Sequence, residues 1–264
     1  MNQIVNTPSM AISGVSASRF EALAQAAKDA AAKERPSISK ISLKSGVISF
    51  GGQPVKDNRL DMVIVAAAYK NAFYKGRYDP QNVVNPDCFS FSSTDDSMVP
   101  DANVAHPEHA TCEGCPRAEW LSDLNGGRGK ACKETRRLVM LPGSVLADKD
   151  PAEAIKTAEL AIVDVPVTSV KNYVQYINVL AASIGLPAHA VLTEMACQPD
   201  AKTQFKVTFK GIGPVSSDAI LDAIEARMPE AVRTSLAGYE SSNEEEDAPA
   251  VPVGLATKKA PKKF

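Results

Sequence analysis

The sequence predicts an α+β fold in which antiparallel strands, joined as hairpins, are flanked by helices and interrupted by a loop-built insertion. Apolar residues alternate with polar residues in several short segments and recur at helical spacing in others. Four of the five cysteines fall between residues 88 and 132, in a window with little periodicity and several Gly or Pro residues. The chain of 264 residues, 44% hydrophobic and 23% charged, is long enough to bury a globular core.

Three parts follow from the composition. Residues 1–37 are predicted to be a flexible N-terminal arm with an Ala-rich helix at 20–34, which ends at Arg35-Pro36. Residues 38–238 form the core domain, with the insertion at about 87–137. Residues 239–264 are predicted to be a disordered C-terminal tail, because five acidic residues and then four lysines stand among few large apolar residues.

The first half of the core begins with two strand patterns. Residues 41–50 alternate between apolar and polar, with Ser45-Gly46 at the centre, which predicts a hairpin. Residues 60–76 are rich in Val, Ile, Tyr and Phe, and predict one long strand or two shorter strands.

Four further strands are predicted on either side of a helix. Residues 136–141 and 158–167 are short apolar segments of strand length. Residues 190–198 and 205–213 both alternate and are separated by a Pro-Asp-Ala-Lys turn, so they predict a second hairpin.

Two segments have helical periodicity. Residues 168–185 place apolar side chains three and four residues apart, with Thr168 or Ser169 as the N-cap and Gly185 as the stop signal. Residues 217–239 predict one helix, or two helices broken near the internal proline.

The clustered cysteines predict a metal site. Cys112 and Cys115 form a C-x-x-C knuckle, whose spacing lets two thiolates bind one tetrahedral ion, and Cys132 follows 17 residues later. A closed structural zinc site needs a fourth ligand, for which we favour Cys88, while His106 and His109 remain alternatives. One structural zinc in a reducing cytosol explains an odd cysteine number better than a disulfide framework does.

A catalytic zinc is the second alternative for the same cysteines. It would keep one coordination position open and use Glu108 or Glu113 as a general base. However, the sequence has no H-E-x-x-H motif, no phosphate-binding loop and only three scattered histidines. We therefore predict no enzymatic activity. Cys197, outside the cluster, is expected to be a small core residue.

Local charge and aromatic content favour single-stranded nucleic acid as a ligand, although the formal net charge is only −2. Residues 69–78 interleave four aromatic residues with three cations, and residues 128–137 hold five cations and one acid. Bases stack on aromatic rings while cations contact phosphates. The candidate nucleic-acid-binding residues are Lys44, Tyr69, Lys70, Phe73, Tyr74, Lys75, Arg77, Tyr78, Arg128, Lys130, Lys133, Arg136 and Arg137.

The cysteine motifs resemble a family of small, mostly uncharacterised proteins of tailed bacteriophages. The residues that carry this resemblance are Pro86-Asp87-Cys88-Phe89-Ser90, Cys112-x-x-Cys115-Pro116 with Trp120 and Ser122, and Gly127-Arg128-Gly129-Lys130-Ala131-Cys132-Lys133 with Arg136-Arg137-Leu138. The match covers roughly residues 38–215 and supports Cys88 as the fourth ligand. The chain is also similar to phage single-stranded DNA-binding proteins with an oligonucleotide-binding (OB) barrel, some of which carry a structural zinc and an acidic tail.

This resemblance implies an OB-like five-stranded antiparallel β-barrel with an inserted zinc-binding loop, and single-stranded DNA binding in phage DNA replication or recombination. It also implies replication or recombination proteins as partners of the C-terminal tail. The tail departs from the family's pattern, because lysines follow the acids and the chain closes on Phe264.

Two other functions stay open at this point. One is a protein-interaction module that modulates a host or phage enzyme such as RNA polymerase, and the other is a zinc-dependent enzyme acting on nucleic acid. No apolar stretch of about 20 residues predicts a membrane span, and no secretory signal is evident, so we expect a protein of the bacterial host cytoplasm. The sequence leaves the oligomeric state open.

Overall fold

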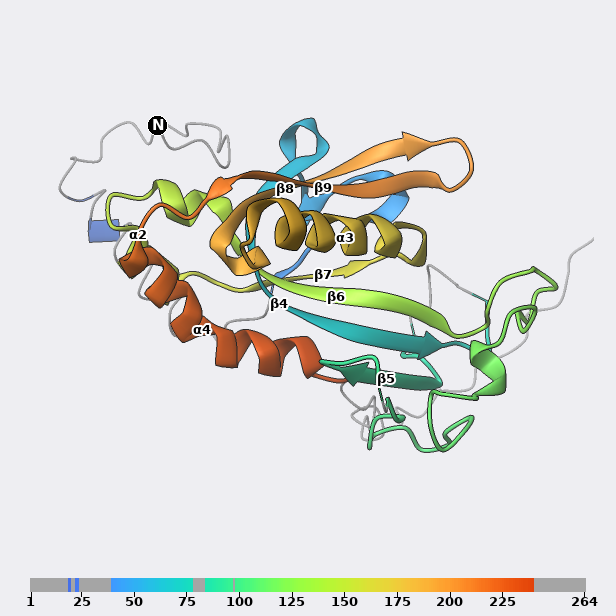
Figure 1. The fold of residues 1–264 in the computed structure, drawn as a ribbon. Coiled ribbons are helices and arrows are strands. Elements are labelled where there is room, and N and C mark those ends of the chain that lie inside the picture. Colours follow the sequence, from blue (N-terminus) through green and yellow to red (C-terminus); the bar gives the residue numbers. More distant parts are fainter. Residues whose placement is uncertain (1–18, 20–21, 24–38, 78–83, 97, 240–264) are drawn as a thin grey trace, which may run out of the picture.

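A computed structural model describes residues 19, 22–23, 39–77, 84–96 and 98–239 (Figure 1). Most of the predicted Ala-rich helix at 20–34 and all but the first residue of the predicted tail at 239–264 lie outside these residues. The described residues form a mixed α+β structure, as the sequence predicts.

A seven-stranded sheet organises the fold, in the order β1-β7-β6-β4-β8-β9, with β5 also paired to β4. All pairs are antiparallel except β1 with β7. The described residues contain no closed barrel, so the prediction of a five-stranded OB-like barrel is not supported beyond its mixed α+β class. The strands are β1 (Ser39–Lys40), β4 (Arg59–Phe73), β5 (Cys88–Ser92), β6 (Lys133–Pro142), β7 (Ala161–Val165), β8 (Val191–Asp200) and β9 (Gln204–Pro214).

Strand β4 is the centre of the sheet and is long enough to serve two neighbours along one edge. Residues 59–63 pair with β8 and residues 69–73 pair with β5, while β6 pairs with residues 62–72 along the opposite edge. A register shift between Ile64 and Ala66 marks a β-bulge, which changes which side chains face each side. Of the two predicted alternatives for residues 60–76, one long strand or two, the structure has one long strand, whereas β5 forms inside the window predicted to be a loop.

Two helical layers cover the two faces of the sheet (Figure 1). Helix α3 (Val167–Val179) continues as a π-helical turn to Ile184 and packs on one face with Met62, Leu138 and Met140. Helices α2 (Pro151–Thr157) and α4 (Asp218–Leu236) cover the other face, where Val63, Val139 and Leu141 are buried. Alternating residues of β4 and β6 thus enter two separate cores, because successive strand side chains point to opposite faces.

The helix ends differ in part from the prediction. Helix α3 starts after Pro166 without a side-chain cap, because the Ser169 hydroxyl instead accepts a hydrogen bond from Val207 N. Gly185, at φ 71°, ends the helical segment as predicted. Helix α4 runs through Pro229 unbroken. The proline removes one backbone hydrogen bond, and its site on the exposed side of α4 leaves the freed carbonyl open to water.

The first predicted hairpin is only partly formed. A single antiparallel bridge joins Ser42 and Ser49 across the Ser45-Gly46 turn, and β2 (Ser49–Phe50) pairs with β3 (Gln53–Pro54) in a separate two-stranded sheet. The second predicted hairpin is confirmed as β8 and β9, with a turn at 201–203 between them.

An irregular segment between β5 and β6 projects from the end of the sheet (Figure 1). Its regular structure within the described residues is one short 3₁₀ turn at Pro116–Ala118. A backbone hydrogen bond from Asp101 N to Phe89 O (2.8 Å) holds it to β5. Within the segment, further backbone hydrogen bonds join Cys112 N to Met98 O (2.9 Å) and Cys132 N to Arg117 O (2.8 Å). Within the described part of the chain, no helix is long and apolar enough to cross a membrane.

Candidate nucleic-acid interface

The four clustered cysteines meet at one pocket but do not form the predicted metal centre. Cys88, Cys112, Cys115 and Cys132 line this pocket with Glu108, His109 and residues of β4. Among the described residues, however, no group of three or more His, Cys, Asp or Glu side chains is arranged to hold a metal ion. The prediction of one structural zinc is therefore wrong.

The thiols and the two histidines have other surroundings instead. Burial, together with the neighbouring cysteines, raises the pKa of Cys132 to about 12. Burial likewise raises the pKa of Cys88. The alternative ligand His109 binds the carbonyl of Thr111 through Nδ1 (2.9 Å), and His106 is exposed. The segment is held by hydrogen bonds and ion pairs instead.

One such ion-pair group sits beside the pocket. Glu108 accepts a hydrogen bond from Arg117 (2.9 Å) and lies 3.1 Å from the ammonium of Lys75. The hydrogen bond from Arg117 is the main reason that the pKa of Glu108 is lowered. Lys75 also donates its backbone N–H to Asp87 (2.7 Å). Lys75 thus links the end of β4 to the irregular segment through its ion pair with Glu108.

The sheet surface on the α3 side carries an aromatic–cation pair. Tyr69 of β4 lies opposite Arg136 of β6, and the Arg136 guanidinium is stacked 3.6 Å from the centre of the Tyr69 ring. Both side chains are half-buried. Glu134 precedes Arg136 by two residues on β6 and therefore points to the same face.

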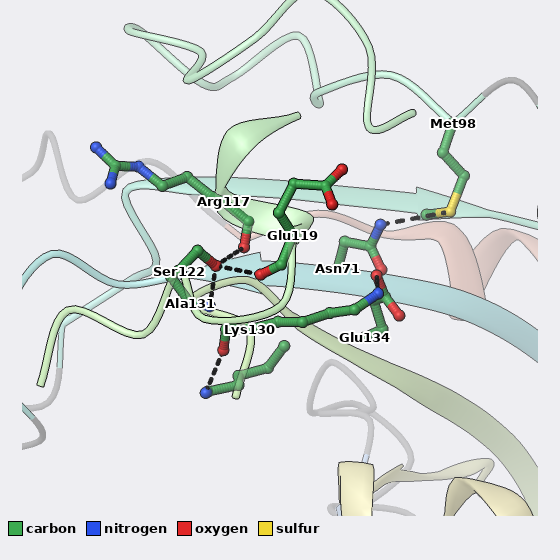
Figure 2. Close-up of polar contacts among 9 residues, drawn as sticks. Asn71, Met98, Arg117, Glu119, Ser122, Lys130, Ala131 and Glu134 are labelled. Carbon is green, nitrogen blue, oxygen red and sulfur yellow. Dashed lines mark hydrogen bonds and ion pairs between the residues drawn. The ribbon is translucent and has the colours of Figure 1, made fainter. Parts of the chain in front are cut away.

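From Glu134 the same surface continues into the irregular segment. The Lys130 ammonium pairs with Glu134 at 2.7 Å (Figure 2). It also lies 5.8 Å from the centre of the Trp120 ring. Trp120 is 72% exposed. The Tyr69–Arg136 pair and the group of Glu134, Lys130 and Trp120 are thus neighbours through Arg136 and Glu134, which share one face of β6. We call these five residues the Tyr69–Trp120 strip. It contains two aromatic rings, two cations and one carboxylate.

Three more of the predicted cations belong to the loop at 123–129 or contact it. Arg77 donates a hydrogen bond to Asn125 (3.0 Å), and Lys133 is 3.9 Å from Asp123. Arg128 is exposed and has no ion pair with any residue that the structure describes.

Three of the predicted nucleic-acid-binding residues are buried. Lys70 is 7% exposed, Arg137 is 8% exposed and Phe73 is 1% exposed. Lys70 and Arg137 both bind Asp164 of β7, at 2.6 and 3.1 Å, on the α4 side of the sheet. Burial raises the pKa of Asp164, but the two cations more than offset this effect, so the carboxylate stays ionised. Arg137 also donates to Ala237 O (2.6 Å), and thereby fixes the end of the described chain.

The other predicted residues lie apart from the strip. Lys44 is on a 3₁₀ turn (Lys44–Gly46) that packs against β8 and β9. Tyr74 follows β4, and its pKa is raised to about 12 by burial and by Tyr239. Tyr78 lies outside the described residues.

Sequence reasoning did not single out Trp120 as a candidate binding residue. It is the only tryptophan of the chain, and it stands between the C-x-x-C knuckle and the basic residues 128–137. The sequence did contain a signal for an exposed ring. Trp120 is a lone aromatic residue in a polar, irregular segment, and this segment lacks the apolar periodicity of a helix or strand that would bury it. No comparable sequence signal predicts the pairing of Lys70 and Arg137 with Asp164, because that pairing depends on the register between strands.

Comparisons of the chain with protein-family models, with curated proteins and with solved structures give no match. The resemblance to phage single-stranded DNA-binding proteins therefore stays a prediction from the motifs at 86–90, 112–122 and 127–138. The function has to be argued from the geometry of the strip.

Proposed function

We propose that this protein binds single-stranded DNA through the Tyr69–Trp120 strip, with little sequence preference. The observation that carries the proposal is the exposed Trp120 ring beside Lys130, which pairs with Glu134 on the face of β6 that also carries Arg136 stacked on Tyr69. Aromatic rings stack on any base, and neighbouring cations track the phosphates. Because neither feature reads base edges, such a surface favours single strands of any sequence. A role in phage DNA replication or recombination follows from the motif resemblance alone.

The exposure of Trp120 supports a ligand. A folded protein generally buries most of a tryptophan side chain, because its large ring contributes more to the core than any other. Trp120 is instead held outward, 72% exposed, in a segment with several backbone and side-chain hydrogen bonds. Burial of the Trp120 ring by a ligand would therefore contribute favourable free energy to binding.

Local electrostatics set the expected strength of the phosphate contacts. Lys130 is already paired with Glu134, whereas Arg77, Arg128 and Arg136 have no carboxylate partner among the described residues. For a single strand, each neutralised phosphate contributes about −0.7 to the slope of log K against log salt. Three contacts predict a slope of about −2.

A protein-interaction module remains the second candidate, because two exposed leucines follow Trp120 within four residues. Leu121 is 73% exposed and Leu124 is 50% exposed. Adjacent exposed apolar side chains are typical of a protein-binding surface. An enzyme such as RNA polymerase would then contact this loop. The zinc-dependent enzyme required the metal site and is not carried forward.

The proposal is tested by fluorescence anisotropy of a labelled oligo-dT, titrated with the full chain at two salt concentrations. We expect binding that weakens with a slope of about −2. Trp120→Ala should weaken binding about 5- to 150-fold, which corresponds to about 1–3 kcal/mol for one stacked base. The matched control is Val179→Ala, an exposed apolar residue on α3, which should leave binding unchanged. No binding at low salt, or equal binding by Trp120→Ala, would overturn the proposal.

A further inference from the structure

Trp120 lies at the tip of a tight turn whose backbone is unusual. The turn comprises residues 119–122, and the Ser122 backbone N–H points to Glu119 O at 3.4 Å. Leu121 occupies the third position with φ at 71°, a conformation that normally favours Gly or Asn. A leucine is kept there only where surrounding contacts fix the backbone.

Those contacts converge on one hydroxyl. Ser122 Oγ lies 2.6 Å from Glu119 O and 3.0 Å from Arg117 O, and it accepts a hydrogen bond from Ala131 N at 2.9 Å (Figure 2). A hydroxyl has one proton and two lone pairs, so the two carbonyl groups share its proton while Ala131 N uses its acceptor capacity. The single side chain thus joins the turn that carries Trp120 to the residues just before β6, among them Lys130.

We infer that Ser122 is the positioning residue of the strip: its hydroxyl fixes the turn at 119–122 so that Trp120 is held beside Lys130 before the ligand arrives. This inference rests on the proposed function for its consequence in binding. Fixing a binding loop in advance lowers the conformational entropy lost when a ligand binds. Ser122 does not contact the ligand, since its oxygen is occupied by three backbone groups.

The test compares Ser122→Ala and Ser122→Thr in the full chain, with Ser183→Ala, an exposed serine after α3, as the matched control. Ser122→Ala should weaken oligo-dT binding about tenfold, in line with hydrogen bonds of about 1 kcal/mol each. The salt slope should not change, because no cation is removed. Ser122→Thr keeps the hydroxyl and should restore binding.

A double-mutant cycle separates positioning from a general loss of structure. In the Trp120→Ala background, Ser122→Ala should have an effect of less than about twofold, because the ring that it positions is gone. A full tenfold loss in that background would show a merely structural role and would overturn the inference.

The free protein gives a readout that does not depend on DNA. Trp120 is the only tryptophan, so the anisotropy decay of tryptophan fluorescence reports its motion alone. Ser122→Ala should add a fast component that Ser122→Thr and Ser183→Ala lack. If the wild-type chain does not bind oligo-dT, the proposed function fails, while this decay still decides the positioning role. An unchanged decay in Ser122→Ala would overturn the inference.

Discussion

Asp164→Asn tests whether Lys70 and Arg137 are structural residues or are available to a ligand. The substitution removes the charge that both cations share but keeps the shape of the side chain. Removing one partner of a buried ion pair costs about 3–5 kcal/mol, because the remaining charge stays buried. The Asp164 side chain is 22% exposed, so partial solvation favours the lower end, about 3 kcal/mol. For a domain of this size, that lowers Tm by roughly 6–12 °C.

The assay is urea unfolding followed by circular dichroism, with Glu134→Gln as the control. Glu134 pairs with Lys130 at the surface, where such a pair contributes about 0–1 kcal/mol. Asp164→Asn should lower the free energy of unfolding by much more than Glu134→Gln does. The oligo-dT affinity of Asp164→Asn should equal that of the wild type when both are measured under conditions in which they are equally folded. A loss below about 1 kcal/mol would refute the structural role.

The same carboxylate predicts a pH dependence with a definite sign. The pKa of Asp164 in the folded protein lies below its ordinary value of 3.8. A lowered carboxyl pKa stabilises the fold above the unfolded-state value, and this contribution is lost as pH falls through the folded-state value. The difference in unfolding free energy between wild type and Asp164→Asn should therefore be constant at neutral pH and shrink below about pH 4. A difference that persists undiminished at lower pH would contradict this assignment.

Three further predictions concern the loop and the fold around it. Arg128→Ala should reduce the magnitude of the salt slope by about 0.7, while the matched Arg233→Ala on α4 leaves it unchanged; an equal effect of both would argue against a local phosphate contact. Leu121→Asn tolerates the positive φ and removes the apolar side chain, so oligo-dT affinity should hold within about threefold, and a larger loss would show that DNA binding depends on the Leu121 side chain. Gly143→Ala should destabilise the fold by about 1–3 kcal/mol in urea unfolding, because the new Cβ would lie 2.9 Å from the backbone of Asp61. The affinity for oligo-dT should not change. An unchanged stability would contradict the packing described.

Local sequence signals predicted the elements that local forces decide. The apolar run at 60–76 became β4, Gly185 ended the α3 segment, and the alternation on both sides of residues 199–202 became the β8–β9 hairpin. In each case the side-chain period and the turn residues act within a few positions of each other.

Other features depend on contacts between distant segments and were not predictable in this way. Strand β5 forms because β4 extends past β8 and leaves its edge free at residues 69–73. The burial of Lys70 and Arg137 follows from the register that places Asp164 beside them. The cysteine spacing predicted a zinc site, but spacing along the chain does not establish that three or more ligands are correctly oriented in space.

The most direct test of the central claim is the intrinsic fluorescence of Trp120 during titration with unlabelled oligo-dT. Because the chain has one tryptophan, any change in its emission originates in the strip. We expect saturable quenching, with the same Kd as the anisotropy titration and the same weakening by salt. Binding of oligo-dT without any change in Trp120 emission would place the DNA elsewhere on the protein and contradict the account.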